Sequence, residues 1–246
     1  MSEPTSDERF AAALAEARLE AIREFAYGAG HEINNPLANI AARAQALLVD
    51  ERDPERRRRL ATIVDQAFRA RDMIGGLMVF ARPPRPQPQV AAIDEIVRAV
   101  LESLPPTAAA RGVRLEYAPP PTPVRVLVDV GQAVEALRAV VMNAVEAVED
   151  GGNVTVAARA GAAAAEVEVA DDGRGMDAAT LRRAFDPFFS GREAGRGIGL
   201  GLPKAWRLAE LNGGAVRVES RAGGGTRVTV EMPLAGQDGA AATARP

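Results

Sequence analysis

The sequence predicts an α+β protein in which a helical hairpin is followed by a region of alternating short strands and helices. Before position 82 the apolar residues recur with the 3.6-residue period of a helix, and after position 90 they form short runs typical of strands. Between these regions lies the proline-rich segment 82–88, which cannot continue a helix. We therefore divide the chain into residues 1–82, a linker over 83–89, a second domain over 90–234 and a disordered tail over 235–246.

Each half of the first region carries one apolar stripe. The first stripe contains Leu19, Ile22, Ala26, Ile33, Leu37, Ile40, Ala44 and Leu47. A break follows, after which Asp53 is the expected N-cap and Pro54 the first residue of the second helix. The second stripe contains Leu60, Ile63, Val64, Ala67, Ile74, Leu77 and Met78. A lone hairpin buries only one side of each stripe, so we expect two chains to pair as a homodimeric four-helix bundle.

The second region predicts strands and helices in alternation. The expected strands cover residues 113–117, 124–128, 154–158, 166–170, 215–220 and 226–232, and the expected helices cover 94–104, 130–148 and 202–212. The last two strands flank residues 221–225 and are expected to form a hairpin.

Composition excludes several kinds of chemistry. The 246 residues include no cysteine and one histidine, His31, and the formal net charge is −3. Thiol catalysis, disulfides, cysteine-based zinc sites and mechanisms that need two histidines are therefore excluded. The charge gives no support to a nucleic-acid partner. No apolar run reaches the ~18 residues of a membrane span and the first residues do not resemble a signal peptide, so we expect a cytoplasmic protein.

His31 is expected on the exposed side of the first helix, away from its apolar stripe. Asn34 and Asn35 follow at the spacing that shares its face. Pro36 is expected to interrupt the helix, because it removes the hydrogen bond to the Glu32 carbonyl at a typical cost of ~3 kcal/mol. The simplest interpretation of such a histidine is a solvated surface residue.

The segment 31–37, His-Glu-Ile-Asn-Asn-Pro-Leu, resembles the phosphoacceptor box of the sensor histidine kinases of bacterial two-component systems. The resemblance implies that His31 attacks the γ-phosphorus of ATP while the Glu32 carboxylate relieves the ring of its proton. The phosphoryl group would then pass to an aspartate in the receiver domain of a response regulator. Asn35 would orient the water that removes this phosphate again.

Four further segments follow in a fixed order. They are Asn143 within a helix, the Asp-x-Gly-x-Gly turn at 171–175, the Phe-Asp-Pro-Phe-Phe run at 185–189 and the glycine-rich loop at 195–202. Each is a weak signal alone, and the loop lacks the Gly-Lys-Ser/Thr of a P-loop. Together they resemble the N, G1, F and G2 boxes of the histidine-kinase ATPase domain of GHKL type, which implies an α/β sandwich with a mixed sheet that binds ATP.

The resemblance also implies roles for individual residues. Asp171 would accept a hydrogen bond from the adenine amine, Gly173 and Gly175 would let the base and sugar approach, and Asn143 would bind Mg²⁺. The triphosphate would be bracketed by Gly197, Gly199, Leu200 and Gly201. The stretch 185–196 would be a mobile lid.

Three positions depart from the family pattern. Ala139 stands where a polar residue is common, and Glu146 stands where many members carry lysine. The F box ends in Ser190-Gly191-Arg192 in place of Thr-Thr-Lys, and Arg192 would supply the cation.

We therefore expect an ATP-dependent histidine kinase. A catalytically degenerate phosphotransfer or scaffold protein is the alternative, and the phosphoacceptor box disfavours a gyrase-type or chaperone-type ATPase. Input would come from an upstream sensor in a longer parent chain or from a separate sensory partner.

Overall fold

The computed structural model describes residues 32–104, 112–191 and 199–236, and the chain divides into two compact units, residues 1–84 and 85–246. His31 and the first three positions of the predicted N-terminal stripe lie outside the described residues. So do Arg192, Gly197 and residues 237–246.

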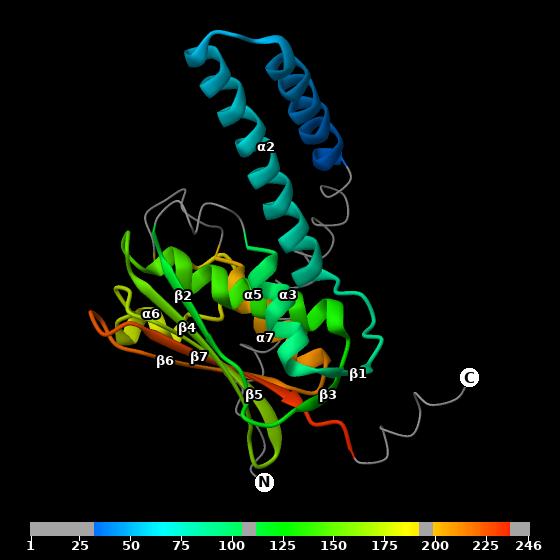
Figure 1. The fold of residues 1–246 in the computed structure, drawn as a ribbon, viewed down its shortest axis with the longest axis vertical. Helices are drawn as coiled ribbons and strands as arrows, with labels where there is room; N and C mark the ends of the chain where they lie inside the picture. The colour runs from blue at the N-terminus through cyan, green and yellow to red at the C-terminus, as the bar shows by residue number, and fades with distance from the viewer. Residues whose placement is uncertain (1–31, 105–111, 192–198, 237–246) are drawn as a thin grey trace, which may run out of the picture. The chain divides into compact units, whose positions relative to one another are not determined.

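The first unit contains two helices, one over residues 32–50 and α2 (Pro54–Ala81), joined by a short connection (Figure 1). The predicted start of α2 is confirmed: the Asp53 side chain accepts a hydrogen bond from the Arg56 N–H at 2.8 Å, and Pro54 is the first helical residue. This N-cap satisfies one of the amide groups that a helix start leaves without a partner.

The helix over residues 32–50 continues past Pro36, so the predicted interruption there is wrong. The proline still lacks the N–H that would bond to the Glu32 carbonyl. Helix formation is cooperative, and the bonds of the following turns hold the backbone in helical form.

Burial along this helix is incomplete within one chain. Ala41 and Ala44 are buried, whereas Ile33, Ile40 and Leu47 are 37%, 47% and 62% exposed. The exposed three recur every seven residues, which places them on one face of the helix. A single hairpin therefore leaves an apolar stripe without cover among the described residues.

The second unit holds the remaining elements. In chain order they are β1 (Gln89–Ala92), α3 (Ile93–Glu102), β2 (Arg114–Ala118), β3 (Arg125–Val128), α5 (Val130–Ala147), β4 (Asn153–Ala160), β5 (Ala164–Asp171), α6 (Ala178–Arg182), α7 (Gly201–Leu211), β6 (Ala215–Ser220) and β7 (Thr226–Pro233).

One layer of this unit is a five-stranded sheet with the strand order β2-β4-β5-β7-β6. The β2–β4 pair is parallel and the other pairs are antiparallel, so the predicted mixed sheet is confirmed, together with the predicted fold class. The predicted hairpin of the last two strands is also confirmed, with Ser220 opposite Thr226. β1 and β3 form a separate antiparallel pair.

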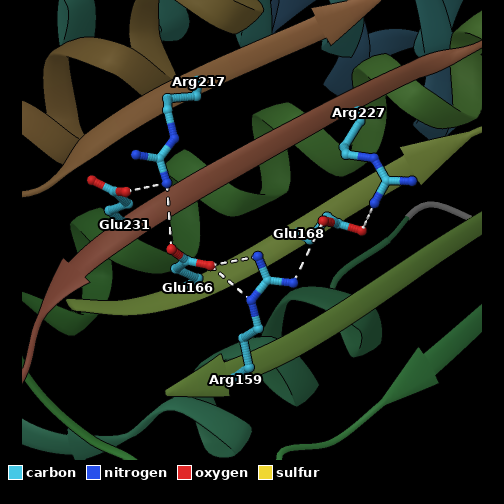
Figure 2. A network of polar contacts seen from close by, with 6 residues as sticks. All are labelled: Arg159, Glu166, Glu168, Arg217, Arg227 and Glu231. Atoms are coloured by element: carbon cyan, nitrogen blue, oxygen red, sulfur yellow. Dashed lines mark hydrogen bonds and ion pairs between the residues drawn. The ribbon is translucent and has the colours of Figure 1, made fainter. Parts of the chain in front are cut away.

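The sheet has two unlike faces. Its apolar face packs under α5 and α7 (Figure 1), and the core there includes Val154, Val156, Val167, Val169, Val228 and Val230. The opposite face carries a network of arginine and glutamate side chains (Figure 2). This alternation along each strand is the expected result of burying one face of a sheet.

Two short elements were not predicted. β1 begins within the expected linker, at Gln89, and α6 is a five-residue helix capped by Asp177, which accepts from the Thr180 N–H at 2.7 Å. Both are too short to show a full apolar period. Among the described helices, none combines the length and the apolar character that crossing a bilayer requires.

Candidate functional site

The end of β5 and the turn after it form the first part of the candidate site. Asp171 is the last residue of β5, and its Oδ1 accepts a hydrogen bond from the Gly173 N–H at 2.9 Å. An aspartate that bonds to the backbone two residues ahead allows a sharp turn. The bond also fixes the direction of the Asp171 carboxylate relative to the turn.

This turn packs directly on the C-terminal end of α5. A Cβ at Gly173 would lie 2.5 Å from the carbonyl oxygen of Ala147, and the Arg174 N–H donates to the same oxygen at 3.5 Å. A side chain at position 173 would therefore push the turn away from the helix that carries Asn143.

The tip of the β6–β7 hairpin closes the other side of the turn. A Cβ at Gly175 would lie 2.0 Å from the Arg221 carbonyl oxygen, and the Gly223 N–H donates to the Arg174 carbonyl at 2.7 Å. The predicted Gly173 and Gly175 are thus both sites of close backbone approach within the protein itself.

Asp172 fastens the turn to the start of β4. Its Oδ1 accepts from the Asn153 N–H at 2.8 Å, and its Oδ2 accepts from the Asn153 side-chain amide. These two hydrogen bonds stabilise the carboxylate and hold the pKa of Asp172 below its ordinary value. Asp172 therefore positions the segment that presents Asp171.

The second part of the site is the N-terminus of α7 against Asn143 of α5. Asn143 is half-buried, and a Cβ at Gly201 would lie 2.6 Å from its Nδ2 and 2.7 Å from its Oδ1. Gly201 is the first residue of α7 and Leu200 is its N-cap. Two segments that are 58 positions apart in the sequence, at 143 and 201, thus meet at one place.

The described part of the predicted lid, residues 185–191, meets Gly199, which follows the lid, backbone to backbone. The Phe188 N–H donates to the Gly199 carbonyl at 3.1 Å, and a Cβ at Gly199 would lie 2.2 Å from the Phe189 carbonyl oxygen. Phe188 has a φ of 64°, a region that non-glycine residues rarely adopt. The Arg183 guanidinium lies 4.0 Å from the centre of the Phe189 ring. The segment between Phe189 and Gly199 includes the predicted Arg192 and Gly197, which lie outside the described residues.

The residues of this site fit a magnesium-bound triphosphate. Leu200 provides no side-chain cap for α7, and an uncapped helix N-terminus favours phosphate. The Asn143 side-chain amide lies at the same place. A single protein ligand suits Mg²⁺ bound to a nucleotide, because phosphate oxygens supply the further ligands of the metal. In the described part of the chain, histidine, cysteine, aspartate and glutamate form no cluster of three or more suited to holding a metal alone. Ala139, one turn before Asn143, is buried and adds no ligand.

Of the residues predicted for the first unit, Glu32 and Asn35 lie on the helix over residues 32–50. Glu32 and Asn35 are exposed, whereas Asn34 is half-buried and its Oδ1 has no hydrogen-bond partner among the described residues. Only the neighbours of His31 can be located, because the histidine itself lies outside the described range.

Thr226 was missed by the sequence analysis. It lies directly opposite Asp171 in the β5–β7 register, and its Oγ1 lies 3.0 Å from the Ser220 Oγ. The Ser220 hydroxyl in turn accepts from the Met176 N–H at 2.8 Å. Only the pairing of β5 with β7 places Thr226 beside Asp171, and no short sequence motif marks it.

The sequence matches two protein-family models. Residues 21–85 match the His Kinase A (phospho-acceptor) domain, and residues 128–236 match the histidine kinase-, DNA gyrase B- and HSP90-like ATPase. The first match covers His31 and the hairpin, and the second covers the candidate site of the second unit.

Individual proteins agree with these matches. The sensor histidine kinase ZraS of Klebsiella oxytoca is 31% identical over 89% of this chain and 48% of its own length. The sensor-like histidine kinase SenX3 of Mycolicibacterium smegmatis is 31% identical over 88% of this chain and 59% of its own length. The crystal structure of full-length ShkA in complex with AMPPNP matches with a TM-score of 0.71 and 27% identity over 86% of this chain and 46% of that one. The chain thus spans about half the length of several relatives it matches.

Proposed function

Because this chain belongs to the histidine kinase family, with a phosphoacceptor domain followed by a GHKL-type ATPase domain, we propose that it is an ATP-dependent protein histidine kinase. His31 takes a phosphoryl group from ATP and donates it to an aspartate in the receiver domain of a response regulator. The observation that carries the proposal is the contact of Gly201 with the Asn143 side chain, which supports one nucleotide site built from α5 and α7.

The first transfer uses the sole imidazole of the chain. One ring nitrogen of neutral His31 attacks the γ-phosphorus, an N–P bond forms, and the bond from phosphorus to the β,γ-bridging oxygen breaks to release ADP. Glu32 accepts the proton of the other ring nitrogen, so the phosphohistidine ring is neutral. Glu32 is exposed, which supports this role because the attacking face must be open to ATP.

The nucleotide is held by groups from several segments of the second unit. Asp171 accepts from the adenine amine, and Gly173 and Gly175 keep side chains out of the turn beneath the base. The triphosphate is bracketed by Gly197, Gly199, Leu200 and Gly201, with Arg192 as the cation from the F box. Asn143 would hold Mg²⁺, which would neutralise phosphate charge when bound with ATP. The uncapped N-terminus of α7 supports this arrangement.

Asn35 serves the reverse reaction in this proposal. It orients the water that removes phosphate from the regulator, so the protein also acts as a regulator phosphatase. Asn35 is exposed on the helix over residues 32–50, which supports access of a receiver domain to its amide.

We propose that the working unit is a homodimer. The exposed stripe of Ile33, Ile40 and Leu47 supports this, because a second hairpin would cover it in a four-helix bundle. The domain limits proposed are 1–82 for the phosphoacceptor domain and 90–234 for the ATPase domain. A cytoplasmic location and input from an upstream sensor or a separate sensory partner complete the proposal.

Labelling with [γ-³²P]ATP and Mg²⁺ tests the kinase activity. The expected result is acid-labile label on the wild-type protein and none on His31→Gln, with the affinity for a non-hydrolysable ATP analogue unchanged by calorimetry. Because the chain has one histidine, no second imidazole can carry the label. Label that persists in His31→Gln would contradict the proposal.

Ala139 and the Ser-Gly-Arg end of the F box favour a second candidate, a phosphotransfer or scaffold protein with a degenerate ATPase domain. Calorimetry with the ATP analogue separates the two functions. Micromolar binding that Asp171→Ala abolishes supports the kinase, and no binding to the wild-type protein supports the scaffold.

A further inference from the structure

The C-cap residue of α7, Asn212, uses its side chain to bind the start of α5. Its Oδ1 accepts from the Asp129 N–H at 2.7 Å. Its Nδ2 donates to the Gln132 Oε1 at 2.9 Å and to the Leu208 carbonyl at 2.8 Å. Gln132 is one of the few buried polar residues among those described. A buried polar group that is satisfied in this way fixes the relative position of the two elements it joins.

Asp129 extends this network to the linker. It is the N-cap of α5, where its Oδ1 accepts from the Gln132 N–H at 3.0 Å. Its other oxygen, Oδ2, accepts from the backbone N–H of Gln87 at 2.9 Å. One carboxylate therefore bonds both to a helix start and to a residue 42 positions earlier in the chain.

Gln87 has an unusual place in the linker. Of residues 83–88, four are proline, so the segment offers backbone N–H groups only at Arg85 and Gln87. A hydrogen bond to a carboxylate is stronger than one between neutral groups. The bond to Asp129 thus fastens a linker poor in donors to the second unit, two residues before Gln89 begins the β1–β3 pairing.

The same pair of helices holds the nucleotide site at its other end. α5 and α7 run antiparallel, since Gly201 of α7 contacts Asn143 late in α5 whereas Asn212 binds residues at the start of α5. The Lys204 Nζ lies 2.5 Å from the Glu135 Oε1 between these two contacts. A nucleotide bound at the N-terminus of α7 would therefore contact a helix whose far end is bonded to Asp129.

We propose that Asp129, held by Asn212, is a positioning residue that anchors the Gln87 backbone of the linker to the nucleotide-binding helix pair. This inference rests on the proposed kinase function, because the linker leads from the ATPase domain to the domain of His31. A fastened linker restricts the orientations in which ATP is presented to the histidine, so loss of the anchor lowers the rate of transfer and leaves ATP binding intact.

The variants Gln87→Pro and Gln87→Ala form a matched pair for testing the anchor. Proline removes the N–H donor within a segment already rich in proline, whereas alanine removes the side chain and keeps the N–H. We expect Gln87→Pro to lower the autophosphorylation rate about tenfold at unchanged affinity for the ATP analogue, and Gln87→Ala to match the wild type.

Asp129→Asn gives a second variant, because asparagine still caps a helix but weakens the bond to Gln87 by removing its charge. Wild-type rates in both Gln87→Pro and Asp129→Asn would overturn the proposal.

Amide hydrogen exchange of the full chain supplies a readout independent of kinase activity. A peptide covering residues 83–88 reports on the Arg85 and Gln87 amides alone. The expected result is one protected amide, whose protection is unchanged by the ATP analogue and lost in Asp129→Asn. Exchange at the rate of an unstructured peptide in the wild type would overturn the anchor. If the wild type took no label from ATP, the proposed function would fail, while this exchange result would still decide whether the anchor exists.

Discussion

Asp171 and Gly225 approach so closely that a Cβ on the glycine would lie 2.0 Å from the aspartate carbonyl oxygen. Asp171 ends β5 and Gly225 directly precedes the neighbouring strand β7, and the hairpin tip that contains Gly225 covers the turn after β5. The position of Asp171 therefore depends on a residue far from it in sequence. That dependence can be tested with two glycines of the same hairpin tip.

Gly225→Ala should abolish binding of an ATP analogue, and Gly223→Ala should not. Both glycines have positive φ, +73° and +71°, so each substitution costs about 1 kcal/mol in backbone strain. Gly223 has no atom within 4 Å of the added Cβ, whereas at Gly225 the Asp171 backbone must move. Urea denaturation measures the strain and calorimetry measures binding. Equal analogue affinities in the two variants would show that the close contact does not position Asp171.

Asp172 should make the stability of the second unit depend on acid pH. Its pKa is lowered by the two Asn153 hydrogen bonds, so the folded protein binds this proton more weakly than the unfolded chain. The stabilisation is present above the ordinary carboxyl pKa of about 4 and is lost as the pH falls through the lower folded value. Asp172→Asn should flatten this loss in urea denaturation series at decreasing pH.

Asn153→Ala provides a graded control for that experiment. It removes the side-chain donor and keeps the backbone N–H that is the larger cause of the shift. Its acid dependence should therefore lie between those of the wild type and Asp172→Asn. A slope in Asp172→Asn equal to that of the wild type would assign the acid sensitivity to other groups.

Most of the fold follows from local patterns because its elements are long or strongly periodic. The β6 strand has the predicted limits, and α5 differs from its prediction by one residue at its end. α5 also shows where periodicity stops being informative. Its buried residues, which include Ala139 and Val140, lie on more than one face, because the helix contacts both the sheet and α7.

The site was less predictable than the fold because its contacts join distant segments. A motif identifies Asp171, but the neighbours Thr226 and Gly225 depend on the register of β5 with β7. Likewise, no pattern near Asn212 indicates that its amide bonds to Asp129. Sequence motifs report groups that act locally, whereas tertiary hydrogen bonds are set by packing.

Lys204 and Glu135 should contribute to stability as a pair. The Lys204 side chain is 13% exposed, so removing Glu135 leaves a mostly buried ammonium group without its carboxylate. Glu135→Leu should destabilise by about 2 kcal/mol, and Glu135→Leu with Lys204→Met should recover much of that loss. Urea denaturation of the double-mutant cycle measures the coupling. A double variant no more stable than Glu135→Leu would contradict it.

Arg217 should stabilise the sheet by separating two like charges. Glu166 and Glu231 lie directly opposite each other on β5 and β7, and the Arg217 guanidinium on β6 pairs with both carboxylates (Figure 2). Arg217→Met should lower the free energy of unfolding by about 1 to 2 kcal/mol, because the pairs are lost and the facing glutamates repel. The loss should shrink in high salt, since screening weakens that repulsion.

Arg217→Met with Glu231→Gln should restore most of the stability. Arg227→Met is the matched control: its partner Glu168 lies opposite Thr229, so no like charge faces that carboxylate and the effect should be smaller. Equal losses in Arg217→Met and Arg227→Met, with no recovery in the double variant, would show that the facing glutamates do not need Arg217.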